Sequence, residues 1–229
     1  MPLRARYRDG EAAVLGFLDD YAYTIWGLLE LYEATFKIEY LQHAVDLQEI
    51  QDQYFWDPEK GGYYFNSMEH EEILFRIKEA YDGAIPSGNS VSMLNLSRLG
   101  RITGETRYDD KAALLMDFFS EKLSISPSSY SFFTAALAFA MGTTHVIVIV
   151  GDPRSNDTKE MIQTLRETYN PYKIVLVKPT DESASIVVQL ASYTQHHIQI
   201  DSRATAYICR NHECMLPTTE PDKMKKLMA

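Results

Sequence analysis

Two pairs of helical segments with matching patterns occupy the first half of this 229-residue chain. Residues 19–36 and 39–54 predict a strongly apolar helix followed by an amphipathic one, and the same order returns about 68 residues later. At that offset identical residues coincide: Leu28 with Leu96, Leu31 with Leu99, Thr35 with Thr103, Tyr40 with Tyr108, Ala44 with Ala112 and Leu47 with Leu115. A helical hairpin cannot bury its apolar face alone, so the repeat predicts stacked units that share a core.

The apolar helices have one further member and similar beginnings. Residues 19–36 carry apolar side chains on nearly every face, which predicts a helix buried on all sides. A third apolar segment, residues 128–141, follows without an amphipathic partner. The three helices are expected to begin at residue types that are common N-caps: Asp19-Asp20, Ser87-Gly88 and Ser128-Ser129.

Around Thr143 the pattern changes from helical pairs to alternating strands and helices. HVIVIV and YKIVLVK predict buried strands, NDTKEMIQTLRETY and SASIVVQLASY predict helices, and HHIQI and TAYICR are short strand candidates. Strands that alternate with helices favour a small α/β unit with a parallel pair. The expected fold is therefore mostly α, with helical hairpins over residues 1–142 and an α/β unit over residues 143–229.

Composition excludes several classes of partner. The net charge of −10 argues against a nucleic-acid partner, which needs a surplus of Lys and Arg. No apolar run reaches the roughly 18 residues that cross a bilayer, so no membrane partner is expected. Two cysteines are too few for a secreted disulfide scaffold, which favours a cytoplasmic protein.

The two cysteines lie in CRNHEC, which holds Cys209, His212 and Cys214. The spacing C-x2-H-x-C is not a standard zinc pattern, and a fourth ligand would have to come from elsewhere. Because free cysteine behaves as a small hydrophobic residue, a buried pair of reduced thiols is the favoured interpretation. Neither a metal nor a cofactor is predicted.

Six motifs, read in order, resemble a known family: GFLDDYA, GLLELYEAT, DPEKGGYYF, DGAIPSGNSVSMLNLSRLGRITGE, SPSSYSFFTAALAF and TAYICRNHECMLPTTEP. They are similar to the C-terminal third of the thioredoxin-domain-containing proteins related to spermatogenesis-associated protein 20. The resemblance implies that residues 1–142 form part of an α/α toroid similar to six-hairpin glycosidases and N-acylglucosamine 2-epimerases. It implies no settled biochemical activity.

The sequence departs from that family in lacking the thioredoxin-like domain and the first half or more of the toroid, and it has no CxxC motif. A fragment, a split gene product and a reduced homologue are alternative hypotheses. An incomplete toroid leaves apolar helix flanks bare, and such patches are usually covered by a partner. A homo-oligomer or a separately encoded N-terminal half is therefore the expected partner, besides a sugar.

Asp19 and Asp20 admit two interpretations. As an N-cap and a first-turn acid they stabilise a helix by about 0.3–1 kcal/mol each. Alternatively, they lie at the mouth of a toroid, where glycosidic chemistry needs an acid and a second carboxylate. The second carboxylate would be Asp82, which otherwise reads as a turn residue before Gly83.

Two functions remain open on this reading. The first is a carbohydrate-active domain in which Asp20 and Asp82 form the catalytic pair. In that function the substrate-binding residues would be Asp19, Trp26, Tyr81 and Asn89. The second is a non-catalytic scaffold that binds a thioredoxin-like domain or the missing half of the toroid.

Overall fold

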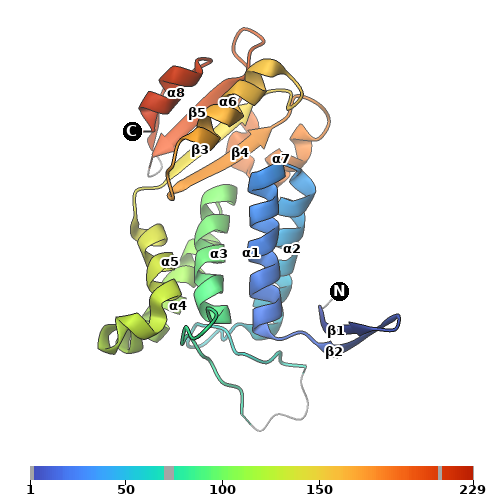
Figure 1. The fold of residues 1–229 in the computed structure, drawn as a ribbon, viewed down its shortest axis with the longest axis vertical. Coiled ribbons are helices and arrows are strands. Elements are labelled where there is room, and N and C mark those ends of the chain that lie inside the picture. The colour runs from blue at the N-terminus through green and yellow to red at the C-terminus, as the bar shows by residue number, and fades with distance from the viewer. Residues whose placement is uncertain (1–2, 70–74, 211–212, 229) are drawn as a thin grey trace. The chain divides into compact units, whose positions relative to one another are not determined.

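The computed structural model describes residues 3–69, 75–210 and 213–228 (Figure 1). The chain divides into two compact units. Unit 1 comprises residues 1–100 and 105–140, and unit 2 comprises residues 101–104 and 141–229. Helices predominate among the described residues, as the sequence predicts. No described helix is both long enough and apolar enough to cross a membrane.

Unit 1 begins with an exposed antiparallel hairpin of β1 (Arg4–Arg8) and β2 (Glu11–Leu15). Helices α1 (Leu18–Thr35) and α2 (Ile38–Phe55) follow and pack side by side (Figure 1). After a long connection come α3 (Gly88–Thr103), α4 (Thr106–Ile125), a 3₁₀ turn at Pro127–Tyr130 and α5 (Ser131–Met141).

The predicted repeat of helix pairs is visible in the links between helices. A single residue with left-handed backbone ends α1 and α3: Phe36 with φ 54° and Gly104 with φ 74°. One further residue, Lys37 or Glu105, then serves as the N-cap of the next helix. The two links lie at the offset of the sequence repeat, so the repeat encodes the hairpin turn as well as the helices.

The burial of the apolar helices α1 and α3 differs from the sequence prediction. Helix α1 is not buried on all sides, because Thr24, Gly27, Leu31 and Ala34 form an exposed stripe at helical spacing. Helix α3 is the buried one: from Gly88 to Gly100 every residue except Leu94 is buried. Its core-facing surface is polar as well as apolar, which hydropathy alone does not reveal.

Polar side chains of α3 bind its neighbours in unit 1. The Asn95 amide donates to the Ala22 carbonyl of α1 at 2.8 Å, and the buried Arg98 guanidinium pairs with Glu30 and Glu33 at 2.7 and 2.8 Å. These bonds satisfy buried donors that would otherwise destabilise the core. Helix α3 is therefore the central helix of unit 1.

Unit 2 contains a four-stranded sheet in the order β4-β3-β5-β6. Its strands are β3 (His145–Val150), β4 (Lys173–Lys178), β5 (Thr205–Arg210) and β6 (Glu213–Cys214). The helices are α6 (Asn156–Glu167), α7 (Ala184–Leu190) and α8 (Pro221–Leu227), with a 3₁₀ turn at Ser192–His196. Strands β3 and β4 are parallel and β5 runs antiparallel to β3, so the predicted parallel pair is present.

Two sequence predictions in unit 2 are wrong. HHIQI is not a strand: His196 ends the 3₁₀ turn, and only Ile200 pairs, as an isolated bridge to Arg203. Cys209 and Cys214 are not buried thiols, because they form a disulfide across β5 and β6 and Cys214 is exposed. Direct pairing of the two residues in the ladder brings their side chains together. His212 lies outside the described residues.

Candidate functional site

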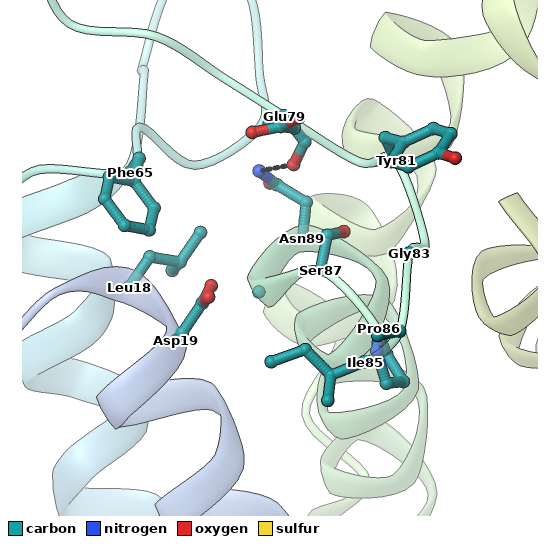
Figure 2. A pocket seen from close by; sticks show the side chains of 12 residues that line it. Leu18, Asp19, Phe65, Glu79, Tyr81, Gly83, Ile85, Pro86, Ser87 and Asn89 are labelled. Carbon is teal, nitrogen blue, oxygen red and sulfur yellow. Dashed lines mark hydrogen bonds between the residues drawn. The ribbon is translucent and has the colours of Figure 1, made fainter. Parts of the chain in front are cut away.

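A cavity of about 250 Å³ opens at the N-terminal ends of α1 and α3 in unit 1 (Figure 2). Its walls are the first turn of α1, Phe65 in the connection after α2, and the segment that leads into α3. The lining residues are Leu18, Asp19, Phe65, Glu79, Tyr81, Gly83, Ala84, Ile85, Pro86, Ser87, Gly88 and Asn89. The Asp82 loop thus shares one pocket with the start of α1.

A backbone hydrogen bond, a pair of stacked rings and a buried side-chain amide hold the walls of the pocket together. The Leu18 amide donates to the Phe65 carbonyl at 3.0 Å, and the rings of Phe17 and Phe65 stack at 5.1 Å. Asn89, fully buried, donates from its amide nitrogen to the carbonyls of Tyr63 and Glu79 and accepts from the Tyr63 amide. Asn89 therefore fixes two walls of the pocket relative to α3.

Asp19 is the carboxylate with the most perturbed environment in the pocket. Burial raises the pKa of Asp19, a hydrogen bond from the Gly88 backbone partly offsets that rise, and the charges of Asp20 and Glu79 add to it. A raised pKa in a cavity, caused by desolvation together with neighbouring charge, is typical of functional carboxylates. Asp19 is therefore poised to hold a proton at higher pH than an ordinary aspartate.

Glu79 is the second carboxylate of the pocket, and the sequence analysis did not select it. Figure 2 shows the side chains of Asp19 and Glu79 on the same hollow. Glu79 lies in an extended segment in which Phe75, Ile77 and Glu79 are exposed and Arg76 and Lys78 point inward. This alternation of period two is the signal that separates Glu79 from the neighbouring basic residues.

The sequence-predicted pair, Asp20 and Asp82, occupies capping positions and does not line the pocket. Asp20 accepts the Phe17 amide at 2.8 Å in the capping box of α1. Asp82 accepts the amide of Ser87 at 2.9 Å and those of Phe132 and Phe133 at 2.8 and 3.1 Å. Asp82 thus caps α5, where the sequence predicts Ser128-Ser129.

The predicted substrate-binding residues separate into two groups. Asp19, Tyr81 and Asn89 line the pocket, and the Tyr81 side chain is 56% exposed. The amide group of Asn89 is occupied by backbone partners, so its role in the structure is to position the walls. Trp26 does not line the pocket; its ring contacts Phe132 at 5.0 Å and its indole donates to Glu30.

Ser87 supplies the cap that the sequence predicts for α3. Its hydroxyl accepts the Ser90 amide at 3.2 Å, which is the usual N-cap geometry. No three His, Cys, Asp or Glu side chains within residues 3–69, 75–210 and 213–228 gather closely enough to hold a metal ion. The pocket lining therefore includes two carboxylates, from Asp19 and Glu79, the hydroxyls of Ser87 and Tyr81, and the aromatic rings of Phe65 and Tyr81.

Substituting Gly88 by alanine is expected to close the inner end of the pocket. A Cβ at this position would stand 2.4 Å from Asp19 Oδ1 and 2.7 Å from Leu18 Cγ, so the start of α1 must shift. Overpacking of this kind costs about 1–3 kcal/mol of stability. Urea unfolding followed by tryptophan fluorescence measures the loss; Gly27→Ala, in open space on α1, is the matched control. Equal stability of both variants would contradict the close approach.

Comparison with known proteins finds similar sequences over nearly the whole length of the chain. The chain is 39% identical over 214 residues to spermatogenesis-associated protein 20 of Rattus norvegicus, and 38% identical to the proteins of that name from Mus musculus and Homo sapiens. Each of these matches covers 93% of the chain. The chain is therefore similar to spermatogenesis-associated protein 20 along nearly all of its own length. No protein-family model matches it.

The match to spermatogenesis-associated protein 20 covers only part of the length of the relatives. The chain spans 27% of the length of each mammalian protein. An uncharacterized protein of Caenorhabditis elegans is 30% identical over 222 residues, which are 96% of the chain and 29% of the relative. The chain therefore corresponds to about a quarter of the length of these relatives.

Proposed function

We propose that unit 1 is part of a carbohydrate-active domain, built as a partial α/α toroid, and that its sugar-binding pocket is the cavity at the start of α1 and α3. The proposal follows the resemblance to six-hairpin glycosidases and N-acylglucosamine 2-epimerases. The observation that supports it is the meeting of Asp19 and Glu79 in one cavity with Phe65 and Tyr81.

In this proposal Asp19 and Glu79 take the roles that the sequence analysis gave to Asp20 and Asp82. Glycosidic and epimerase chemistry needs a group that donates a proton and a group that accepts one. The raised pKa of Asp19 suits the proton donor, and the exposed Glu79 suits the acceptor. Phe65 and Tyr81 offer faces against which a sugar ring packs.

A specific observation also favours the alternative, a non-catalytic scaffold. Large apolar side chains are exposed on the helices of unit 1: Leu31 on α1 is 46% exposed, and Leu114 on α4 is 50% exposed. Large apolar side chains that stay exposed on a helix are candidates for contact with a protein partner. In this alternative the partner is a second copy, a thioredoxin-like domain or the missing part of the toroid.

Thermal shift against a panel of mono- and disaccharides separates the two functions. A sugar at about ten times its dissociation constant stabilises the folded state by roughly 1.4 kcal/mol, which raises Tm by about 3–6 °C for a chain of this size. Under the first proposal at least one sugar gives this shift, and Asp19→Asn and Glu79→Gln each abolish it.

The controls distinguish pocket carboxylates from caps. Asp117→Asn, an exposed carboxylate on α4, is expected to keep the full shift relative to its own sugar-free Tm. Asp20→Asn and Asp82→Asn are expected to lower the sugar-free Tm and to keep the shift. Loss of the shift in Asp20→Asn or Asp82→Asn alone would return the catalytic pair to those residues. If no sugar in the panel raises Tm, the non-catalytic scaffold is favoured.

A further inference from the structure

The disulfide between Cys209 and Cys214 lies on the sheet of unit 2. These are the two cysteines of the chain, and both are in the bond. We propose that this disulfide is a reversible redox site whose electron donor is a protein dithiol. Its reduction and reformation then switch the β5–β6 hairpin between a disulfide-bonded form and a dithiol form.

Accessibility is the first observation that supports this proposal. Cys214 is exposed on β6, the edge strand of the sheet, whereas Cys209 is half-buried on β5. Thiol–disulfide exchange requires an incoming thiolate to reach one sulfur of the bond. Cys214, the more exposed of the two residues, is therefore the point of attack, and Cys209 is the leaving group.

The second observation is that the hairpin is held without the disulfide. After β6 the chain continues along β5, where the Met215 amide donates to the Ile208 carbonyl at 2.9 Å. Further along, Ala206 and Thr218 exchange both backbone hydrogen bonds at 2.8 and 3.0 Å. Ile208 and Ala206 are fully buried. Reduction therefore leaves the strand pairing and its core in place.

The third observation is the small loop that the bond closes, since the cysteines are five residues apart. A disulfide stabilises a fold mainly by restricting the unfolded chain, and the shortest loops gain least from it. This disulfide is exposed, restricts the unfolded chain only slightly and lies on a hairpin that is already paired. It is therefore better suited to thiol–disulfide exchange than to stabilising the fold.

The exchange is balanced as a two-electron transfer. A thiolate of the partner attacks Cys214 Sγ, an intermolecular S–S bond forms, and the Cys209–Cys214 bond breaks. Cys209 leaves as a thiolate and takes a proton from solvent. The second thiol of the partner, once deprotonated, attacks the mixed disulfide and releases Cys214, which is then protonated. The chain gains two electrons and two protons, and the partner becomes a disulfide.

The test measures reduction in native buffer and the position of the mixed disulfide. The full chain, oxidised in air, is treated with dithiothreitol without denaturant, and thiols are counted by alkylation and mass spectrometry. We expect two thiols to appear while the far-ultraviolet circular dichroism stays unchanged. With a thioredoxin whose resolving cysteine is replaced by serine, we expect a trapped adduct at Cys214 at least tenfold more often than at Cys209.

Matched single variants test the direction of attack. Cys209→Ser leaves Cys214 as the free thiol, and Cys214→Ser leaves Cys209, so alkylation of the first is expected to be at least tenfold faster. The double variant Cys209→Ser/Cys214→Ser is expected to keep the circular dichroism of the wild type. Failure of the bond to form in air, reduction only in denaturant, unfolding on reduction, or adducts mainly at Cys209 would each overturn the proposal.

Discussion

Substituting Asp57 by asparagine is expected to lower the free energy of unfolding by about 3–5 kcal/mol, because it leaves a buried cation without its partner. Asp57 Oδ2 lies 2.6 Å from Lys78 Nζ, and the two side chains are 8% and 5% exposed. The same carboxylate accepts the Tyr64 hydroxyl and the amides of Glu59 and Lys60. Urea unfolding followed by tryptophan fluorescence is a suitable measurement, since Trp26 and Trp56 both lie in unit 1.

The loss is expected to depend on pH in a defined direction. Burial by itself would raise the pKa of Asp57, but the hydrogen bonds from Lys78, Tyr64 and the Glu59 and Lys60 amides outweigh it and hold the pKa well below the ordinary value of 3.8. The unfolded chain therefore binds more protons than the folded chain in acid. The stabilisation is fully present above the ordinary pKa and disappears as the pH falls below it.

A double variant provides the control for Asp57. Replacing a buried pair by apolar side chains is often nearly neutral, whereas removal of one partner is strongly destabilising. Asp57→Asn/Lys78→Met is therefore expected to be more stable than Asp57→Asn alone. A loss below about 1 kcal/mol in the single variant, or a loss that grows as the pH falls from 4 to 3, would contradict the role of the ion pair.

Substituting Asp82 by alanine is expected to cost about 2–3 kcal/mol, because one carboxylate accepts three backbone amides, one from nearby Ser87 and two from the distant start of α5. A single hydrogen bond to a charged acceptor is worth about 1.5–3 kcal/mol, and loss of an exposed N-cap costs about 1 kcal/mol. The expected loss equals about one such bond, because water can reach the freed amides at this partly buried site. Asp82→Asn keeps one acceptor oxygen and no charge, so it should give an intermediate loss. The same fluorescence-monitored unfolding measures all variants.

The control for Asp82 is Asp117→Ala, an exposed residue of α4 whose substitution should change stability by less than about 0.5 kcal/mol. If Asp82→Ala is as mild as this control, the amides of Phe132 and Phe133 are satisfied without the carboxylate. In that case Asp82 is not needed to cap α5, and the catalytic interpretation of this residue gains support.

The elements of secondary structure were predictable because their signals are local. Each predicted element follows from a pattern that spans only a few neighbouring residues. This holds for the individual helices of the repeated pairs, for the N-cap Ser87 and for the two strands of the parallel pair. The burial of α1 was overestimated for a related reason: apolar composition shows that a helix can be buried, and only packing decides which face is covered. The exposed stripe at Thr24, Gly27 and Leu31 has no counterpart in the pattern.

The candidate site was predictable in position and only partly in its residues. One of the two interpretations of Asp82 placed its loop beside the start of α1, and its neighbours Tyr81 and Gly83 line one pocket with Leu18 and Asp19. It could not assign the carboxylates, because adjacent residues of a helix point about 100° apart and only packing decides which of them faces the cavity. Asp19 lines the cavity and Asp20 caps the helix, although both are first-turn aspartates.

By itself the sequence determined that this protein has helical hairpins followed by an α/β unit and an acidic residue at the start of its first apolar helix. Only the tertiary structure decided that Asp82 caps a helix 50 residues away, that Glu79 joins Asp19 in the pocket, and that two cysteines form a bond. The physical reason is range. Periodicity and capping preference act along a few residues, whereas a polar side chain finds its final partner only when distant segments pack and bury it.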